Sequence, residues 1–154
     1  MPEDGAPKNP ANDPRERVGA RMRSAGEAVG IDFTGKTDRY PNSTKAHVLL
    51  SFAERDSGRE VQNRLQEILF RHYFTDGKYP DEANLREAAA EAGLNVEKAM
   101  AAVASKSEQD AVRREAEQSS RMGISGVPYF FVNGKPMGSG AQPPEAFLQA
   151  FDRA

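Results

Sequence analysis

The sequence contains no cysteine among its 154 residues. Structural disulfides, cysteine nucleophiles, thiolate zinc sites and dithiol redox exchange all require the sulfur atom that only this side chain supplies. We therefore predict no catalytic residue for thiol chemistry in this chain, and no metal site. A chain of this length fits one domain and is long enough to bury an apolar core.

An excess of basic residues is also lacking. Lys+Arg total 21 and Asp+Glu 23, for a formal net charge of −2, so there is no electrostatic footprint for a nucleic-acid partner. The longest apolar stretches, at residues 88–90 and 130–132, are far shorter than the ~20 residues of a membrane-spanning helix. Residues 1–5 lack the charged and apolar regions of a secretion signal. We expect no membrane partner and a cytoplasmic location.

Histidines are few as well, and no cluster of polar side chains indicates a reaction. We interpret His47 and His72, both on predicted helices, as surface or core-edge residues without a metal or acid–base role. The remaining polar and turn-forming residues are interpreted as structural. A solvated helix face accounts for Asp81, Glu82, Glu87 and Glu91. Ser119 and Ser120 have no histidine nearby in the sequence, and turns account for Gly134, Gly138 and Gly140. We expect no cofactor.

Helical spacing of apolar residues dominates the first four-fifths of the chain. Residues 1–12 contain three prolines and few apolar side chains, so we predict a tail or leading loop without a core. Six helices are expected between residues 13 and 122. Capping signals place their starts and ends at Asp13, Asn42 or Ser43, Asp81, Asn95 and Ser107, and at Gly30, Gly58, Gly77, Gly93 and Gly123.

The pattern changes after residue 126. Residues 127–132 are β-branched and aromatic, and Asn133-Gly134 is a strong hairpin signal before a short strand at 135–139. A last helix starting near residues 142–145 carries Phe147, Ala150 and Phe151 on one face, and we expect it to pack on the hairpin. Pro128 lies at the start of a strand that otherwise has the composition of a central one. From the residues alone, a trans Val127–Pro128 bond is favoured over cis.

Several segments together resemble one known family. Residues 123–130 read Gly-Ile-Ser-Gly-Val-Pro-Tyr-Phe, and Gly134-Lys135 and residues 139–145, Ser-Gly-Ala-Gln-Pro-Pro-Glu, follow. This run resembles the carboxyl-terminal signature of the DsbA-like thioredoxin family, in its FrnE-like branch. Segments 42–47, 70–74 and 85–94 are similar to that branch in the same order. The resemblance implies a cis Pro128, with Val127 presenting backbone groups to a bound peptide or thiol substrate.

The implied fold is α/β and helix-rich: a thioredoxin-like fold with an inserted helical domain. Residues 13–122 would form this helical domain, and residues 123–154 the C-terminal hairpin and last helix. FrnE-like proteins open with a strand, a CxxC pair at the head of a helix and a second strand, which this sequence lacks. We expect the N-terminal βαβ portion, about 30 residues or more, to be missing. The strand at 127–132 would then expose an edge to another chain or to a second copy.

The function implied by the resemblance is that of a DsbA/FrnE-like oxidoreductase, a family whose members exchange thiols and disulfides. Without cysteine, we expect this chain to be redox-inactive. Two alternatives stay open at this point. One is a relative of glutathione-dependent isomerases and kappa-type glutathione transferases, which share the helical insertion and the cis-proline. The other is a non-catalytic module that binds a peptide or a partner's strand.

Overall fold

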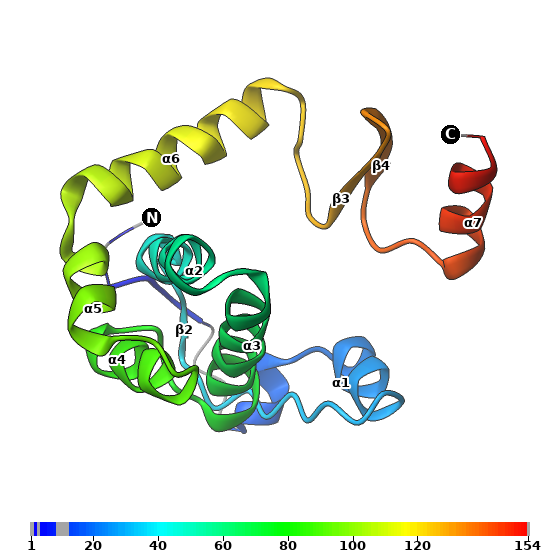
Figure 1. Ribbon diagram of the computed structural model, residues 1–154. Coiled ribbons are helices and arrows are strands. Elements are labelled where there is room, and N and C mark those ends of the chain that lie inside the picture. The colour runs from blue at the N-terminus through cyan, green and yellow to red at the C-terminus, as the bar shows by residue number, and fades with distance from the viewer. Residues whose placement is uncertain (1, 3, 9–12, 154) are drawn as a thin grey trace. The chain divides into compact units, whose positions relative to one another are not determined.

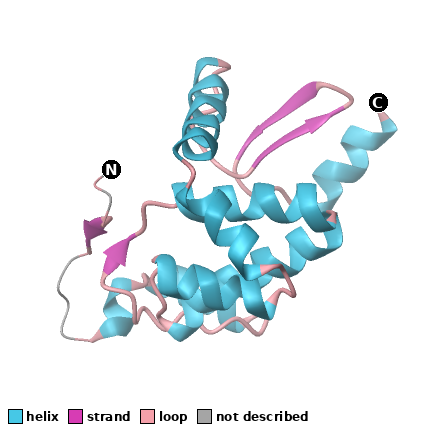
Figure 2. Cartoon of the chain, turned by 60° about the vertical axis from the view of Figure 1, so that its left-hand side comes forward, coloured by secondary structure: helices cyan, strands magenta, loops and turns pink. Residues whose placement is uncertain are grey.

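The computed structural model describes residues 2, 4–8 and 13–153. The chain divides into two compact units, residues 1–112 and 113–154, each described here by itself. The division falls within helix α6 (Lys106–Arg121), earlier in the chain than the boundary expected after residue 122. Figure 1 shows the order of the elements, and Figure 2 the two separate strand pairs.

Helices make up most of the first unit. Its α-helices are α1 (Ala20–Glu27), α2 (Thr44–Ser57), α3 (Arg59–Phe70), α4 (Glu82–Glu91) and α5 (Val96–Ala104). A 3₁₀ helix, η1 (Pro14–Arg17), precedes α1, and a π-helix, η2 (Arg71–Asp76), continues α3. The predicted caps at Asp81 and Asn95 are confirmed, because their side chains accept hydrogen bonds from the amides of Asn84 and Lys98 at 2.9 and 3.0 Å.

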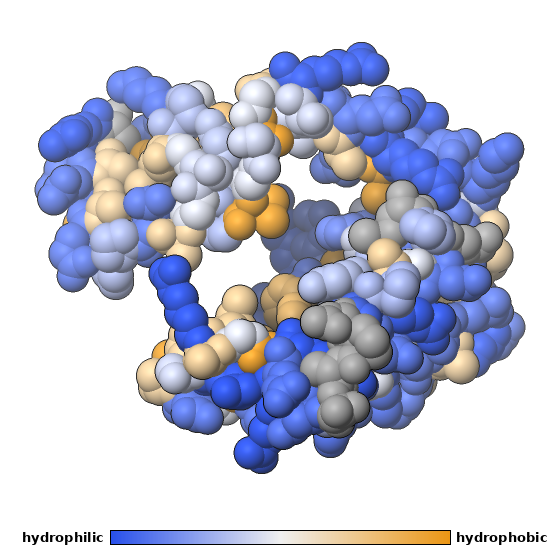
Figure 3. All heavy atoms as spheres, turned by 180° about the vertical axis from the view of Figure 1, so that it is seen from behind, coloured by the Kyte–Doolittle hydropathy of each residue, from blue (hydrophilic) through white to orange (hydrophobic). Residues whose placement is uncertain are grey.

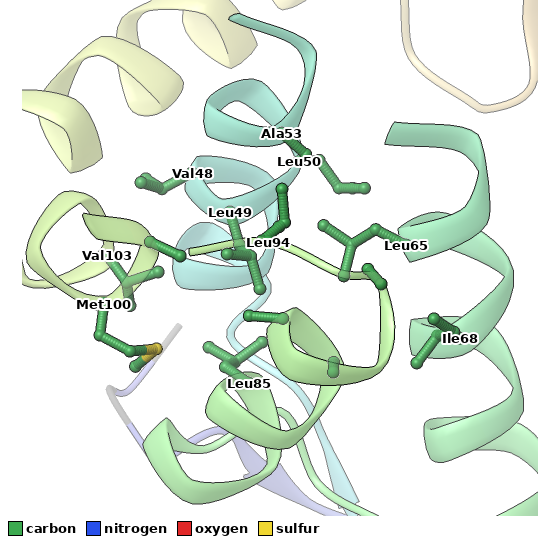
Figure 4. Close-up of a cluster of buried hydrophobic side chains, with 14 residues drawn as sticks. Val48, Leu49, Leu50, Ala53, Leu65, Ile68, Leu85, Leu94, Met100 and Val103 are labelled. Atoms are coloured by element: carbon green, nitrogen blue, oxygen red, sulfur yellow. The ribbon is translucent and has the colours of Figure 1, made fainter. Parts of the chain in front are cut away.

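One apolar core, contributed by α2 to α5, holds the first unit together. Figure 4 shows side chains from these four helices pointing toward one another. Leu49, Leu65 and Leu85 are fully buried, one each from α2, α3 and α4. Helical spacing alone predicted most of the buried set: Val48, Leu49, Leu50, Ala53, Leu65, Ile68, Leu85, Ala88, Ala89, Ala92, Leu94, Ala99, Met100 and Val103.

The prediction of one continuous helix from Asp13 to Gly30 is wrong, because the region contains two separate helices, η1 and α1. Asp13 caps only η1, accepting from the Arg15 amide at 2.9 Å, and Val18 is extended before Gly19 caps α1. Extended backbone at Val18 and the low helix propensity of Gly19 explain the interruption. The expected end at Gly30 is confirmed by a Schellman motif, in which the Ile31 amide donates to the Gly26 carbonyl at 2.8 Å.

A short strand pair lies where the sequence indicated a tail. Strand β1 (Ala6–Pro7) pairs antiparallel with β2 (Arg39–Tyr40), and the Lys8 amide donates to the Asp38 carbonyl at 2.7 Å. Gly5 has a φ of +78°, and a Cβ there would lie 2.2 Å from the Tyr40 carbonyl oxygen. Strands of two residues are too short to produce an alternating pattern. The rest of the expected tail, residues 1, 3 and 9–12, lies outside the described residues.

The second unit contains a β-hairpin and the last helix. Strands β3 (Tyr129–Val132) and β4 (Lys135–Ser139) are antiparallel, joined by Asn133 and Gly134 with φ of +48° and +75°. Two positive φ values are typical of the predicted type I′ turn. Phe130 pairs with Gly138 and Phe131 with Pro136, so Met137 is an extra residue in a β-bulge.

Helix α7 (Pro144–Asp152) contacts this hairpin through one aromatic pair. The rings of Phe130 and Phe147 lie edge to face, with centroids 4.8 Å apart. The expected packing of the last helix on the hairpin is therefore confirmed at Phe147. Phe151, expected on the same face, is 59% exposed. Among the aromatic pairs of the described residues, Phe130–Phe147 is the one that joins this helix to the hairpin.

The outer surface is strongly polar. On the face in Figure 3, hydrophilic side chains cover most of the molecule and apolar ones form small patches. Helix α6 has no fully buried residue among those described, and the Ser105 hydroxyl, two residues before the expected cap, accepts from the Glu108 amide at 3.4 Å. In the described part of the chain, no helix is both long and apolar enough to cross a membrane.

The Phe130–Phe147 contact predicts that truncating Phe147 and truncating Phe151, both in α7, will affect the hairpin differently. Phe147→Ala removes an edge-to-face pair worth about 0.5–1.5 kcal/mol beyond its buried area, so exchange of the β3 amides should accelerate. Phe151→Ala, in the same helix but exposed, serves as the matched control and should leave those rates nearly unchanged. Hydrogen exchange followed by NMR measures both. Equal acceleration in the two variants would contradict the packing described here.

Candidate functional site

The segment Val127–Pro128 lies directly before strand β3 and is open to solvent. The peptide bond between the two residues is cis, and the Val127 side chain is 87% exposed. The Pro128 carbonyl accepts from the Gly140 amide at 2.8 Å, which continues the pairing of β3 with β4 past Tyr129. This bond fixes the position of Pro128 against the end of β4.

Gly140 and Gln142, which follow β4, support this segment. Gln142 donates from Nε2 to the Gly140 carbonyl at 3.2 Å, while the Gly140 amide donates to the Pro128 carbonyl. Gly140 has a φ of +97°, a conformation that favours glycine and fits its prediction as a turn residue. The contact of Gln142 was not predicted, and the signal for it was its place in the run Ser-Gly-Ala-Gln, which carried the family resemblance.

The aromatic residues of β3 divide between the two faces of the hairpin. Phe130 contacts α7, whereas Tyr129 and Phe131 lie together on the opposite face with ring centroids 5.1 Å apart. Phe131 is 47% exposed, so this face presents apolar surface to solvent, as Val127 does at 87%. Among the described residues, β3 has β4 as its one strand neighbour, and its other edge is unpaired. An unpaired edge beside apolar side chains is suited to binding an extended chain.

The backbone of Val127 is available for such an interaction. Within the described part of the chain, no hydrogen bond involves its amide or carbonyl group. Both histidines of the sequence belong to the first unit, and Ser119 and Ser120 lie on α6. The second unit therefore provides peptide groups and apolar side chains, but no imidazole or thiol to act as base or nucleophile.

The carboxylates of α4 form ion pairs that the sequence did not indicate. Glu91 accepts from Arg71 at 2.6 Å, and Glu87 accepts from Lys78 at 2.6 Å. Both glutamates were interpreted as a solvated helix face that repels itself slightly. The basic partners come from η2 and the loop after it, a pairing between elements that spacing along one helix does not reveal.

These ion pairs shift the protonation of the groups involved. Hydrogen bonds from Arg71 hold the pKa of Glu91 below its ordinary value of 4.5, and Lys78 lowers the pKa of Glu87 in the same way. The Glu91 carboxylate in turn raises the pKa of Arg71. Among the described residues, no group of three or more potential ligands is placed to hold a metal ion. The cluster is suited to joining η2 to α4.

The lowered pKa of Glu91 predicts acid sensitivity. Because its folded-state pKa lies below the unfolded value, the ion pair stabilises the fold fully above that unfolded value, and this stabilisation disappears as pH falls through the folded pKa. Glu91→Gln should therefore lower stability at pH 7 and flatten the decrease in stability below pH 4.5. Urea unfolding across pH measures this. Glu115→Gln, on exposed α6, is the control; a parallel pH profile in both variants would contradict the assignment.

Comparison with known proteins identifies the class. A helix-rich first unit followed in the chain by a hairpin and a terminal helix is the arrangement of a thioredoxin-like fold of the α/β class, as seen in DsbA proteins. Residues 3–152 match the DSBA-like thioredoxin domain over nearly the whole sequence. The chain therefore belongs to the DsbA-like thioredoxin domain family, as the resemblance of its C-terminal segments implied.

Two solved structures are similar to this chain. A probable DsbA oxidoreductase from Streptomyces coelicolor shares 29% identity, with a TM-score of 0.72 over 86% of this chain and 57% of that protein. A candidate protein disulfide isomerase from Nitrosomonas europaea gives a TM-score of 0.75 at 16% identity, over 97% of this chain and 78% of the other. The chain thus spans little more than half of the Streptomyces protein. No curated protein matches it.

Proposed function

We propose that this chain is a member of the FrnE-like branch that binds a peptide or thiol substrate at Val127 and Pro128 and does not exchange disulfides by itself. This proposal depends on one observation, the exposed Val127–Pro128 segment in a chain without any cysteine. It is supported by the family match across residues 3–152 and by the C-terminal run that resembles the FrnE-like signature.

The chemistry of disulfide exchange supports the first part of this proposal, that the chain does not exchange disulfides by itself. Exchange proceeds by attack of a thiolate on a disulfide sulfur through a mixed disulfide, so the protein must supply a sulfur nucleophile. The hydroxyl groups of serine and threonine ionise far less readily than a thiol and form no disulfide. A substrate bound here would therefore be held without being oxidised or reduced, unless a thiol from another molecule reached it.

The second part of the proposal, binding of a substrate, depends on the groups around Val127. Its amide and carbonyl make no hydrogen bond within the described chain, and one residue separates Val127 from β3, a strand with one edge unpaired among the described residues and with the rings of Tyr129 and Phe131 on one face. An extended peptide added to this edge would gain backbone hydrogen bonds and bury apolar side chains on the aromatic face. A second copy of the chain offers the same kind of strand, so self-association would use the same edge.

A titration with a defined peptide tests this site. The probe is a ten-residue peptide rich in valine and leucine with S-methylcysteine at its centre, which removes any redox reaction. The amide resonances of Gly126, Val127 and Tyr129 should shift, and Val127→Asp should weaken binding about tenfold, since it places a charge against apolar peptide groups. Leu148→Asp, also exposed but on α7, is the control. Unchanged affinity in Val127→Asp would contradict the proposed site.

The same samples distinguish the alternatives. Insulin reduction by dithiothreitol should proceed at the rate without protein, and any acceleration would contradict the redox-inactive assignment. Reduced glutathione, added in place of the peptide, should leave the amide resonances of Gly126, Val127 and Tyr129 unshifted. Saturable shifts with glutathione would instead favour the glutathione-dependent relatives. If copies associate through β3, sedimentation velocity should show the peptide dissociating them.

A further inference from the structure

A cavity of about 580 Å³ lies in the first unit, away in sequence from the hairpin site. All of its lining residues fall between residues 8 and 84. Its volume is within the range of small-molecule sites, roughly 300–1,000 Å³. Six aromatic side chains contribute to its wall: Phe33, Tyr40, Phe70, Tyr73, Phe74 and Tyr79.

The aromatic wall is organised around Phe74. Its ring meets Phe33 edge to face at 5.5 Å between centroids, Tyr73 edge to face at 5.0 Å and Phe70 at 5.9 Å. The π-helix η2 places His72, Tyr73 and Phe74 in succession on this wall, and such π turns are frequent at functional sites. Phe70 and Phe74 are nevertheless 50% and 40% exposed, so a ligand that covered them would gain from burial of apolar surface.

The charged groups of the lining are all basic. Lys8, Arg17 and Lys78 contribute positive charge, and no aspartate or glutamate of the described chain is among the lining residues. Lys78 is neutralised by Glu87 at 2.6 Å, whereas Lys8 and Arg17 form no ion pair with a carboxylate of the described residues. Of these two cations, Arg17 already donates to the backbone carbonyls of Gly35 and Lys36, and Lys8 donates to a single hydroxyl group.

Lys8 is held in place by aromatic and hydroxyl groups instead of a carboxylate. Its Nζ lies 4.9 Å from the ring centroid of Tyr73 and 5.4 Å from that of Tyr40, and donates to the Thr37 hydroxyl at 3.1 Å. Ring faces attract a cation but leave its charge uncompensated. An ammonium group fixed in this way beside an apolar cavity is a suitable partner for an anion.

A buried imidazole also belongs to the lining of the cavity. His72 is only 3% exposed, and both of its ring nitrogens are enclosed by the protein, so they do not face the open space of the cavity. Its Nε2 lies 3.4 Å from a Glu91 carboxylate oxygen, and this contact helps to lower the pKa of Glu91. The imidazole therefore belongs to the Arg71–Glu91 cluster, and the groups that face a ligand are Lys8 and the aromatic wall.

We propose that this cavity binds a small aromatic anion, with its ring system against Phe70, Tyr73 and Phe74 and its anionic group on Lys8. The aromatic wall selects a flat apolar body, and the basic lining without carboxylates selects negative charge. This site shares no residue with the Val127–Pro128 segment. Its test is therefore independent of the peptide-binding proposal.

Calorimetry with two ligands of the same shape tests the charge requirement directly. The probes are 2-naphthoate and 2-naphthamide, which share the ring system and differ in charge. Naphthoate should bind the unmodified protein about tenfold more tightly, the equivalent of one hydrogen bond to a charged group. Equal affinities, or no binding of either probe, would overturn the proposal without any variant being made.

Substitutions then locate the site. Lys8→Met keeps the length of the side chain and should reduce naphthoate affinity to that of naphthamide, leaving naphthamide unchanged. Lys98→Met, on the exposed side of α5, is the matched control and should change neither. Phe70→Leu, at a half-exposed position, should weaken both probes equally. Undiminished naphthoate binding in Lys8→Met, or naphthoate-induced amide shifts confined to residues 126–132, would overturn the assignment to this cavity.

Discussion

The apolar contact among α2, α3, α4 and α5 is the constraint on which the first unit depends. Leu49, Leu65 and Leu85 are fully buried in it, and the described residues of this apolar core lie between residues 48 and 103. This core fixes α3, whose continuation into η2 places His72 to Phe74. The cavity wall and the Arg71–Glu91 pair therefore both depend on helix packing, because each includes residues of η2, which directly follows α3.

The second unit holds the Val127–Pro128 segment in place without any cysteine side chain. Pro128 is positioned by the hydrogen bond from the Gly140 amide to its carbonyl, and β3 by the contact of Phe130 with Phe147, neither of which requires sulfur. Under the proposed function, holding a substrate and reacting with it would be separate properties of this fold. Residues 126–142 would supply the peptide groups, and a thiolate would have to come from another molecule.

Sequence reasoning succeeded where a single element carries the signal. Helical spacing predicted the core positions of α2 to α5, and Asn133-Gly134 predicted the hairpin turn. It failed where the partners are distant in sequence. Glu91 gave no sign of Arg71, and Lys8 gave none of Tyr40 or Tyr73, since these pairs form only after the helices pack. The two-residue strands β1 and β2 are likewise too short for any periodicity.

The bulge in the hairpin makes its two outer edges chemically unequal. Strand β4 contains Pro136, which has no amide hydrogen, and the extra residue Met137 beside Gly138, whose φ is +97°. A proline and a bulge each interrupt the regular row of donors that a neighbouring strand needs. Strand β3 has neither within Tyr129–Val132. The outer edge of β4 is consequently less suited than that of β3 to pairing with a further strand.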